Sequence, residues 1–337
     1  MAAAAAKQGS SFAASLEQGG LDAAALHAFA DAIGVRHAAA APVSGSAFRQ
    51  RLIDAARTPA QRAELALHND DIDRRARGGR IRKLNDGMPA DVLYDLAAPI
   101  VQMLHDGLPT EANILANRYL DVNAQGATGW ALLPLLLSLR AGAESNVALA
   151  ERALQPASPR LVVIGGLSGT GKSTLARLLG ARIGRIPGGR VLRSDVFRKR
   201  LVGLPPETRL PPAHYTRHSD EATYEAMFES ADDHLACGSS VILDAVFMSR
   251  SERDVAEALA IRARVPFTGI WLEAPEQDRI ERVRGRASDA SDASVEVVRE
   301  QSRRSVGDLS SWHRMRANRP LDLIVPAARA VLERVGR

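Results

Sequence analysis

Short apolar runs alternate with helical patterns along the second half of the chain. The runs cover residues 161–164, 190–193, 240–243, 266–272 and 321–325. Alternation of this kind is typical of right-handed strand, helix, strand crossovers and of a parallel sheet that helices cover on both faces. We therefore expect a doubly wound α/β domain over residues 158–337.

The first half of the chain shows helical patterns and no convincing strand alternation. Leu26, Phe29 and Ile33 share one helical face before Gly34. Similar patterns follow over residues 90–105, 110–121 and 128–154. Apolar residues at this spacing indicate amphipathic helices rather than strands. The pattern therefore predicts an all-α domain.

A capping signal supports this interpretation and helps to set the domain limits. Thr58 and Gln61 form a capping box, with Pro59 at the first helical position. We expect the helical domain to cover residues 21–157. The alanine-rich segment over residues 1–20 is expected to be a flexible tail, because its only lysine follows the apolar run instead of preceding it as in a secretory signal.

A glycine-rich turn follows the first apolar run of the second half. Gly166, Gly171, Lys172 and Ser173 have the G-x-x-x-x-G-K-[ST] spacing of a Walker A phosphate-binding loop. Glycines let consecutive backbone N–H groups turn inward on one anion, at the positive end of a helix. The residues expected to bind the nucleotide are Gly166, Leu167, Ser168, Gly169, Thr170, Gly171, Lys172, Ser173 and Thr174.

Lys172 and Ser173 have specific expected roles in this loop. Lys172 would reach the β and γ phosphates of ATP, and the Ser173 hydroxyl would bind Mg²⁺. The chain has 44 basic residues, of which only four are lysines. A lysine at position 172 therefore indicates a place that a planar guanidinium does not fit. The alternative is a glycine-rich turn that holds no ligand.

Composition restricts the class of protein. A length of 337 residues allows two domains, and a single cysteine, Cys237, excludes an internal disulfide. No apolar stretch is long enough to cross a membrane, so a cytoplasmic protein without a membrane or disulfide-linked partner is expected. The excess of basic residues lies after residue 157 and suits a polyanionic ligand. The scarcity of aromatic residues there argues against a nucleic-acid partner.

Ligands bind beyond the carboxyl ends of parallel strands, and this rule selects three further places. Asp195 follows the second apolar run, between Arg193 and Arg198, and its alternative role is an N-cap. Asp244 ends the third run like a Walker B aspartate that binds Mg²⁺, and its alternative role is that of a turn residue. The third place is an arginine-rich helical segment over residues 279–286, whose alternative is an exposed charged helix.

Residues 75–155 resemble the distal helical lobe of aminoglycoside-phosphotransferase-like proteins. The resemblance rests on three segments, 91–97, 111–121 and 132–141. That family needs an H-x-D-x-x-x-x-N catalytic loop, and the near match here is His68 with Asp70, five residues before Arg75. An arginine cannot replace the metal-binding asparagine, so His68 and Asp70 are expected on a solvated helix face. The region is therefore predicted to have lost any kinase activity of its own.

Residues 160–310 resemble small P-loop kinases of the zeta-toxin, gluconate-kinase and chloramphenicol-phosphotransferase group, often labelled AAA family ATPases. The segments that carry the resemblance are Gly166–Thr174, Arg193-Ser-Asp195 and the Asp-Ala-Ser-Asp-Ala sequence that begins at Asp289. The resemblance implies that Asp195 activates a substrate hydroxyl. It also implies that Arg282 and Arg286 stabilise the transferred phosphoryl group. Arg193 and Arg198 are expected to bind the acceptor.

The sequence thus predicts an ATP- and Mg²⁺-dependent phosphotransferase that acts on a small hydroxylated metabolite. A GTPase would need an N-K-x-D element, which the four lysines do not provide, and a mechanical AAA ATPase would need glutamate at position 245, which is Ala245. Two alternatives remain open: an ATP-binding regulatory module that controls a partner through the helical domain, and a polynucleotide 5′-end kinase.

Overall fold

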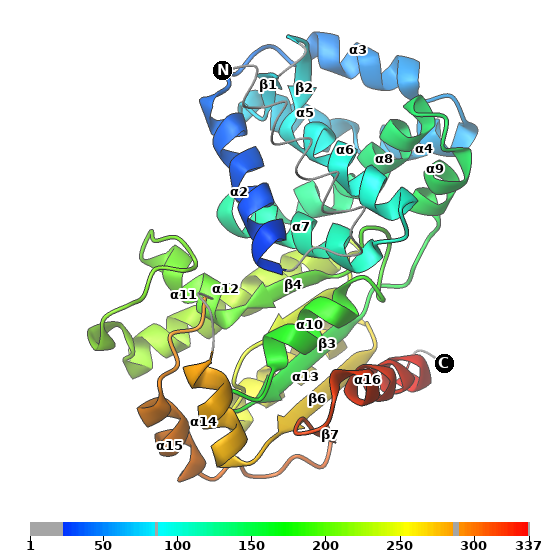
Figure 1. The fold of residues 1–337 in the computed structure, drawn as a ribbon. Coiled ribbons are helices and arrows are strands. Elements are labelled where there is room, and N and C mark those ends of the chain that lie inside the picture. The colour runs from blue at the N-terminus through cyan, green and yellow to red at the C-terminus, as the bar shows by residue number, and fades with distance from the viewer. Residues whose placement is uncertain (1–22, 85–86, 286–289, 336–337) are drawn as a thin grey trace. The chain divides into compact units, whose positions relative to one another are not determined.

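The computed structural model describes residues 23–84, 87–285 and 290–335 (Figure 1). The tail predicted for residues 1–20 lies outside these ranges. The chain divides into two compact units. The first unit contains the chain up to Ala124 together with Leu133–Leu154, and the second contains Gln125–Leu132 and the chain from Gln155 onward.

The first unit is mainly helical. Its helices are α2 (Ala23–Ala39), α3 (Ser46–Ala55), α4 (Pro59–Leu67), α5 (Asn69–Arg77), α6 (Val92–His105), α7 (Pro109–Val122), most of α8 (Gly126–Ala143) and α9 (Val147–Leu154). The capping box predicted at Thr58 and Gln61 is confirmed at the start of α4. The unit is not entirely α-helical, however, because β1 (Ile81–Lys83) and β2 (Pro89–Asp91) form an antiparallel pair. Strands of three residues are too short to show an alternating pattern in the sequence.

Helix α2 continues past the glycine that was expected to follow its apolar face. Gly34 is buried within the helix, and a Cβ atom there would lie 2.3 Å from the Asn123 Nδ2 atom. Gly34 therefore serves close packing inside the first unit instead of ending the helix. Leu26 and Ile33 are buried as predicted, whereas Phe29 is only partly buried.

The second unit contains a five-stranded parallel sheet in the order β4, β5, β3, β6, β7. The strands are β3 (Leu161–Gly166), β4 (Arg190–Arg193), β5 (Val241–Asp244), β6 (Phe267–Glu273) and β7 (His313–Arg316). The first four strands coincide with four predicted apolar runs. Their carboxyl ends lie at one edge of the sheet, because all the pairings are parallel.

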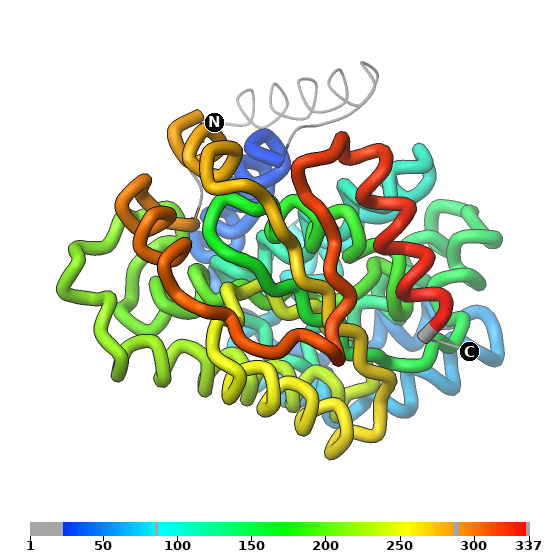
Figure 2. Tube along the Cα trace, turned by 90° about the horizontal axis from the view of Figure 1, so that it is seen from below, coloured from blue at the N-terminus to red at the C-terminus, as the bar shows by residue number. Residues whose placement is uncertain are grey.

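Helices cover both faces of this sheet. The α-helices of this unit in the described ranges, apart from the first part of α8, are α10 (Lys172–Gly180), α11 (Ser194–Leu201), α12 (Arg217–Ala236), α13 (Arg250–Ala263), α14 (Glu276–Arg284), α15 (Val295–Ser302) and α16 (Leu321–Val335). One core cluster joins the sheet to α12 and α13, and a second joins it to α10 and α16. Figure 2 shows α13, in yellow, and α16, in red, on opposite sides of the strands.

The prediction of a fifth strand over residues 321–325 is wrong, because this segment begins α16. Ile324, Ala328 and Leu332 are buried at a spacing of four residues, so the apolar run belongs to one face of a helix. The fifth strand is β7, over residues 313–316, whose polar sequence His-Arg-Met-Arg gives no apolar signal.

Candidate nucleotide and phosphoryl-transfer site

The loop between β3 and α10 has the backbone geometry of an anion-binding turn. Gly166, Gly169 and Gly171 have φ angles of 141°, 84° and 94°, in the region that favours glycine. A Cβ atom at Gly166 would lie 2.6 Å from the Leu272 carbonyl oxygen, and one at Gly169 would lie 2.7 Å from the Arg279 carbonyl oxygen. Conformation thus favours glycine at all three positions, and close packing adds a second requirement at Gly166 and Gly169.

Lys172 begins α10 and folds back toward the loop. Its Nζ atom donates a hydrogen bond to the Leu167 carbonyl oxygen at 3.2 Å. The Thr170 hydroxyl donates to the same oxygen at 2.8 Å. The ammonium group is therefore held beside the loop at the positive end of a helix, where an anion is favoured.

Arg193, at the end of β4, contacts the end of β5 and the first turn of α10. Its Nη2 atom donates to the Ser173 hydroxyl oxygen at 3.2 Å, and its Nε atom lies 3.3 Å from an Asp244 carboxylate oxygen. Arg193 and Asp244 end β4 and β5 and are partners in the parallel register, whereas Ser173 follows the loop after β3. The two predicted Mg²⁺ ligands, Ser173 and Asp244, thus share one guanidinium.

Asp195 lies in the first turn of α11, directly after β4. The alternative role of N-cap does not apply, because Arg193 occupies the N-cap position and no side chain caps this helix. Burial, a hydrogen bond to Asp292 and the charges of Asp292 and Asp195 raise the pKa of the Tyr215 hydroxyl. This influence places the Asp195 carboxylate in the electrostatic environment of Tyr215.

Arg198 lies one helical turn beyond Asp195 on α11. Its guanidinium forms an ion pair with Asp220 at 2.7 Å and donates to the Ser219 hydroxyl at 3.1 Å. It also lies 5.0 Å from the ring centroid of Tyr215. The Arg198 side chain is largely buried. Together with Tyr215 it forms a wall next to Asp195. A direct contact between Arg198 and an acceptor stays a prediction.

A buried lysine, Lys199, belongs to the same wall and was not predicted to act. Its side chain is fully buried and lies 3.0 Å from an Asp292 carboxylate oxygen. The ammonium also donates to the carbonyl oxygens of Ala290 and Pro206, at 2.9 and 3.3 Å. Asp292 accepts further hydrogen bonds from Tyr215 and the Leu210 N–H. The only sequence signal was the use of a lysine in an arginine-rich chain.

Arg282 lies beside the phosphate loop, on α14. Its guanidinium donates to the Ala317 carbonyl oxygen at 2.7 Å and to those of Gly169 and Thr170 at 3.4 Å. Loop N–H groups that converge on an anion leave the carbonyl groups pointing outward. Arg282 is therefore on the outer side of the loop in this structure and braces it. Arg286, the other predicted lid arginine, lies outside the described residues.

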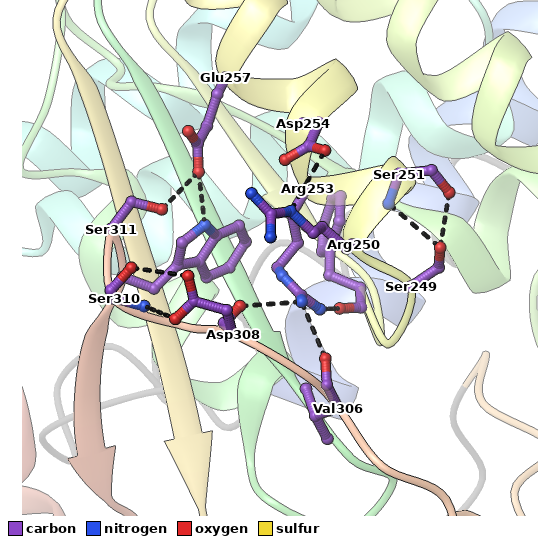
Figure 3. A network of polar contacts seen from close by, with 12 residues as sticks. Ser249, Arg250, Ser251, Arg253, Asp254, Glu257, Val306, Asp308, Ser310 and Ser311 are labelled. Carbon is purple, nitrogen blue, oxygen red and sulfur yellow. Dashed lines mark hydrogen bonds and ion pairs between the residues drawn. The ribbon is translucent and has the colours of Figure 1, made fainter.

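The buried Arg253 holds the segment that follows Asp244. Arg253, on α13, is 2% exposed and donates to the carbonyl oxygens of Phe247, Met248, Val306 and Asp308 at 2.8 to 3.0 Å (Figure 3). Phe247 has a φ angle of 52°, which is uncommon for a residue with a side chain. Strained backbone of this kind persists only where surrounding contacts hold it, and Arg253 supplies them here.

The first unit gives no sign of a second phosphotransfer centre among its described residues. His68 is partly buried, and hydrogen bonds to Glu64 and Asp71 outweigh burial and raise its pKa. The predicted solvated face is therefore correct for Asp70, which is exposed, but wrong for His68. Arg75, which occupies the asparagine position, forms a buried pair with Asp91 at 2.6 and 2.7 Å.

No helix in the described ranges is long and apolar enough to span a membrane. Within the same ranges, no group of three or more histidine, cysteine, aspartate or glutamate side chains is arranged to hold a metal ion. A divalent cation at Ser173 and Asp244 would therefore depend on oxygen atoms that a ligand supplies. Cys237, at the end of α12, is exposed.

Comparison with known proteins gives a match to an AAA domain family over residues 161–306. Uncharacterized proteins of Mycobacterium bovis and Mycobacterium tuberculosis are each 31% identical over 179 residues, which are 52% of this chain and 35% of theirs. The chain thus spans about a third of the length of these curated relatives.

Similar solved structures include a gluconokinase from Sinorhizobium meliloti, at 20% identity and a TM-score of 0.39, covering 52% of this chain and 93% of that chain. Another is the Mycobacterium tuberculosis APS kinase in complex with AMPPNP and APS, at 19% identity and a TM-score of 0.38, covering 53% and 99%. The AAA domain match falls on the phosphate loop and on the strands that carry Arg193 and Asp244. The prediction of a P-loop NTPase fold with an N-terminal helical region is confirmed.

Proposed function

We propose that the second unit is an ATP- and Mg²⁺-dependent kinase that transfers the γ-phosphoryl group to a hydroxyl of a small acceptor. The observation that carries the proposal is the Arg193 guanidinium, which joins Ser173 to Asp244 and lies two positions before Asp195 in the chain. Phosphoryl transfer requires little covalent chemistry from the protein, so positioned cations and one proton acceptor account for most of its catalysis. Kinases among the similar structures are consistent with this proposal.

Each residue of the site has a role in the proposed reaction. The loop N–H groups and Lys172 bind the phosphates of ATP, and Arg193 contributes positive charge between the loop and β5. Asp195 accepts the proton of the attacking hydroxyl, while the oxygen attacks the γ-phosphorus and ADP leaves. Arg198 and Tyr215 orient the acceptor beside Asp195, and the buried Lys199 supports Tyr215 through Asp292.

Ser173 and Asp244 would hold the magnesium ion. The donor set fits this ion, because Mg²⁺ in phosphoryl-transfer sites is bound through one or two protein oxygens together with substrate phosphates. The ion would neutralise charge on the β and γ phosphates. Arg193 already balances the Asp244 carboxylate, so its guanidinium and the ion would share one set of oxygen atoms.

The Asp195→Asn variant tests this proposal. Asparagine keeps the size of the side chain but cannot accept the proton, so we expect transfer to fall by about 10² to 10⁴ while ATP affinity and thermal stability stay near parental values. The assay uses γ-labelled ATP, Mg²⁺ and fractionated cell metabolites. Glu229→Gln, an exposed change on α12, is the matched control.

The same assay separates the proposal from its alternatives. Transfer at the parental rate by Asp195→Asn would remove Asp195 from the mechanism and leave Asp244 as the leading carboxylate. Slow hydrolysis of ATP without any labelled acceptor would favour an ATP-binding regulatory module. A labelled 5′ end of an oligonucleotide would favour a polynucleotide kinase. Parental ATP affinity in Lys172→Ala would contradict the assignment of the phosphate loop.

We also propose that the first unit is a degenerate phosphotransferase lobe without a reaction of its own. The support is the buried pair between Arg75 and Asp91, which occupies the position where the related catalytic loop has its metal-binding asparagine. Asp91 also caps α6 through the Leu93 N–H at 2.8 Å. Both Asp91 carboxylate oxygens therefore already accept hydrogen bonds within the unit.

A further inference from the structure

Gln301, near the end of α15, contacts the phosphate loop through a backbone group of that loop. Its Oε1 atom accepts a hydrogen bond from the Ser168 N–H at 2.8 Å. The contact joins residues separated by 133 positions in the chain. A donor of the loop is thus satisfied by a side chain from another element and not by the loop itself.

The hydrogen bonds at Ser168 and at Lys172 belong to one peptide group. The peptide between Leu167 and Ser168 offers its N–H to Gln301 and its carbonyl oxygen to the Lys172 ammonium, at 3.2 Å. In a trans peptide the N–H and the C=O point in opposite directions. Gln301 therefore holds one side of the peptide plane while Lys172 lies on the other.

From this geometry we infer that Gln301 is a positioning residue for Lys172, an inference that rests on the proposed function. Rotation of the peptide plane would turn the Leu167 carbonyl oxygen away from the ammonium, and the hydrogen bond to Gln301 opposes that rotation. The Leu167 carbonyl oxygen also accepts hydrogen bonds from the Thr170 hydroxyl and N–H, and hydrogen bonds at both ends of one peptide polarise each other. The carboxamide of Gln301 thus fixes where the catalytic ammonium stands before ATP binds.

Helix α15 is itself held firmly enough to serve this purpose. Ser302, the next residue, accepts a hydrogen bond from Arg279 of α14 at 2.5 Å and donates to the Val298 carbonyl oxygen at 2.8 Å. The backbone of Arg279 packs directly against Gly169 of the loop. The loop is therefore bracketed by α14 at Gly169 and by α15 at Ser168.

The residues just before α15 contact the wall next to Asp195. Asp292, three residues before Val295, accepts hydrogen bonds from Tyr215 and the Leu210 N–H and pairs with Lys199. The segment from Asp292 to Gln301, which includes most of α15, thus connects the wall next to Asp195 with the peptide that holds Lys172. A change in the wall next to Asp195 can therefore shift α15 and, through Gln301, the Lys172 ammonium.

The test compares Gln301→Leu, which removes the acceptor oxygen at similar size, with Gln301→Glu, which keeps an acceptor oxygen. Lysine-selective ¹³C labelling gives few signals, because the chain has only four lysines. The Lys172 resonance, assigned with Lys172→Arg, is followed together with ATP and ADP affinity by calorimetry. Gln277→Leu, the same exchange at an exposed position of α14, is the control.

We expect Gln301→Leu to shift the Lys172 resonance and to weaken ATP binding about five- to tenfold, the value of one net hydrogen bond. Gln301→Glu should keep the parental Lys172 resonance, and the buried Lys199 should not respond in either variant. A parental Lys172 resonance and ATP affinity in Gln301→Leu would overturn the inference. Failure of the parent protein to bind ATP would instead refute the proposed function, since the resonance still reports the peptide contact.

Discussion

Lys199 shows how strongly a single buried charge depends on its partners. All three ammonium protons can be used, on the Asp292 carboxylate and on the carbonyl oxygens of Ala290 and Pro206. Hydrogen bonds from Tyr215 and the Leu210 N–H, together with Lys199, outweigh burial and lower the pKa of Asp292. The Asp292 carboxylate is thus charged at neutral pH, and removing one member of the pair leaves the other buried without its partner at a large cost.

Removal of one partner should therefore destabilise the protein more than removal of both. We expect Asp292→Ala to lower the free energy of unfolding by about 3 to 5 kcal/mol, because it leaves a buried ammonium without its counter-ion. Lys199→Met should cost less, since Asp292 keeps Tyr215 and the Leu210 N–H. A double-mutant cycle by urea unfolding, with exposed Lys83→Met as control, measures the coupling. Strictly additive costs would contradict it.

Sequence reasoning at the scale of residues succeeded where the backbone dictates the residue type. Gly166, Gly169 and Gly171 follow from a motif whose φ angles only glycine adopts easily, and Asp244 follows from its place at the end of an apolar strand. Gln301 and Lys199 could not be found in this way. Their partners are distant in the chain, and a lone glutamine or lysine gives no local signal.

Helix α12 carries an unusual buried histidine. His234 is 5% exposed, its Nδ1 atom donates to the Ser230 carbonyl oxygen at 2.6 Å, and its buried Nε2 atom has no hydrogen-bond partner among the described residues. Burial, assisted by the nearby charge of Arg190, lowers the pKa of His234 to about 4. The imidazole is therefore neutral at pH 7, and protonation favours the unfolded chain.

Acid should accordingly weaken the second unit through α12. The folded pKa lies below the unfolded value of about 6.5, so this stabilisation is complete above that value and is lost as the pH falls toward 4. By pH 4 the loss should reach about 2 to 3 kcal/mol relative to a protein without the group. Urea unfolding of His234→Leu at pH 7 and pH 4.5, beside the exposed control His218→Gln, measures this. An equal pH dependence of the unfolding free energy in the parent and in His234→Leu would contradict a lowered pKa of His234.

The prediction of elements was accurate where a strand is buried on both faces. Strands β3 to β6 read as apolar runs because helices cover both sides of the sheet. Helix α16 was mistaken for a strand, since its first turn concentrates four apolar residues in five positions, Leu321 to Val325. Only the later residues, such as Ala328 and Leu332, reveal the helical spacing.

At the scale of the whole molecule, each of the two units contains buried ion pairs. The described part of the first unit contains the buried Arg75–Asp91 pair, with side chains 6% and 2% exposed. The sequence suggested only that Arg75 was unsuitable as a metal ligand. It could not show that Arg75 has a partner 16 positions away.

Arg75→Met should lower the free energy of unfolding of the first unit by about 3 to 5 kcal/mol, because Asp91 would remain buried without its counter-ion. Arg49→Met breaks an exposed pair with Asp73 in the same unit and should cost less than about 1 kcal/mol. Urea unfolding followed by circular dichroism compares the two variants. Equal free energies of unfolding for Arg75→Met and Arg49→Met would show that the buried pair stabilises the unit no more than the exposed pair does. ATP affinity should be unchanged, since all the proposed nucleotide contacts belong to the second unit.

The polar sequence of β7 has a further consequence, for association between molecules. This strand forms one edge of the five-stranded sheet, and an open edge offers unpaired backbone groups to strands of other chains. His313, Arg314 and Arg316 are exposed along it, and charged side chains on an edge oppose such pairing. The polar residues that give β7 no apolar signal in the sequence thus also oppose the addition of strands from other chains to this edge.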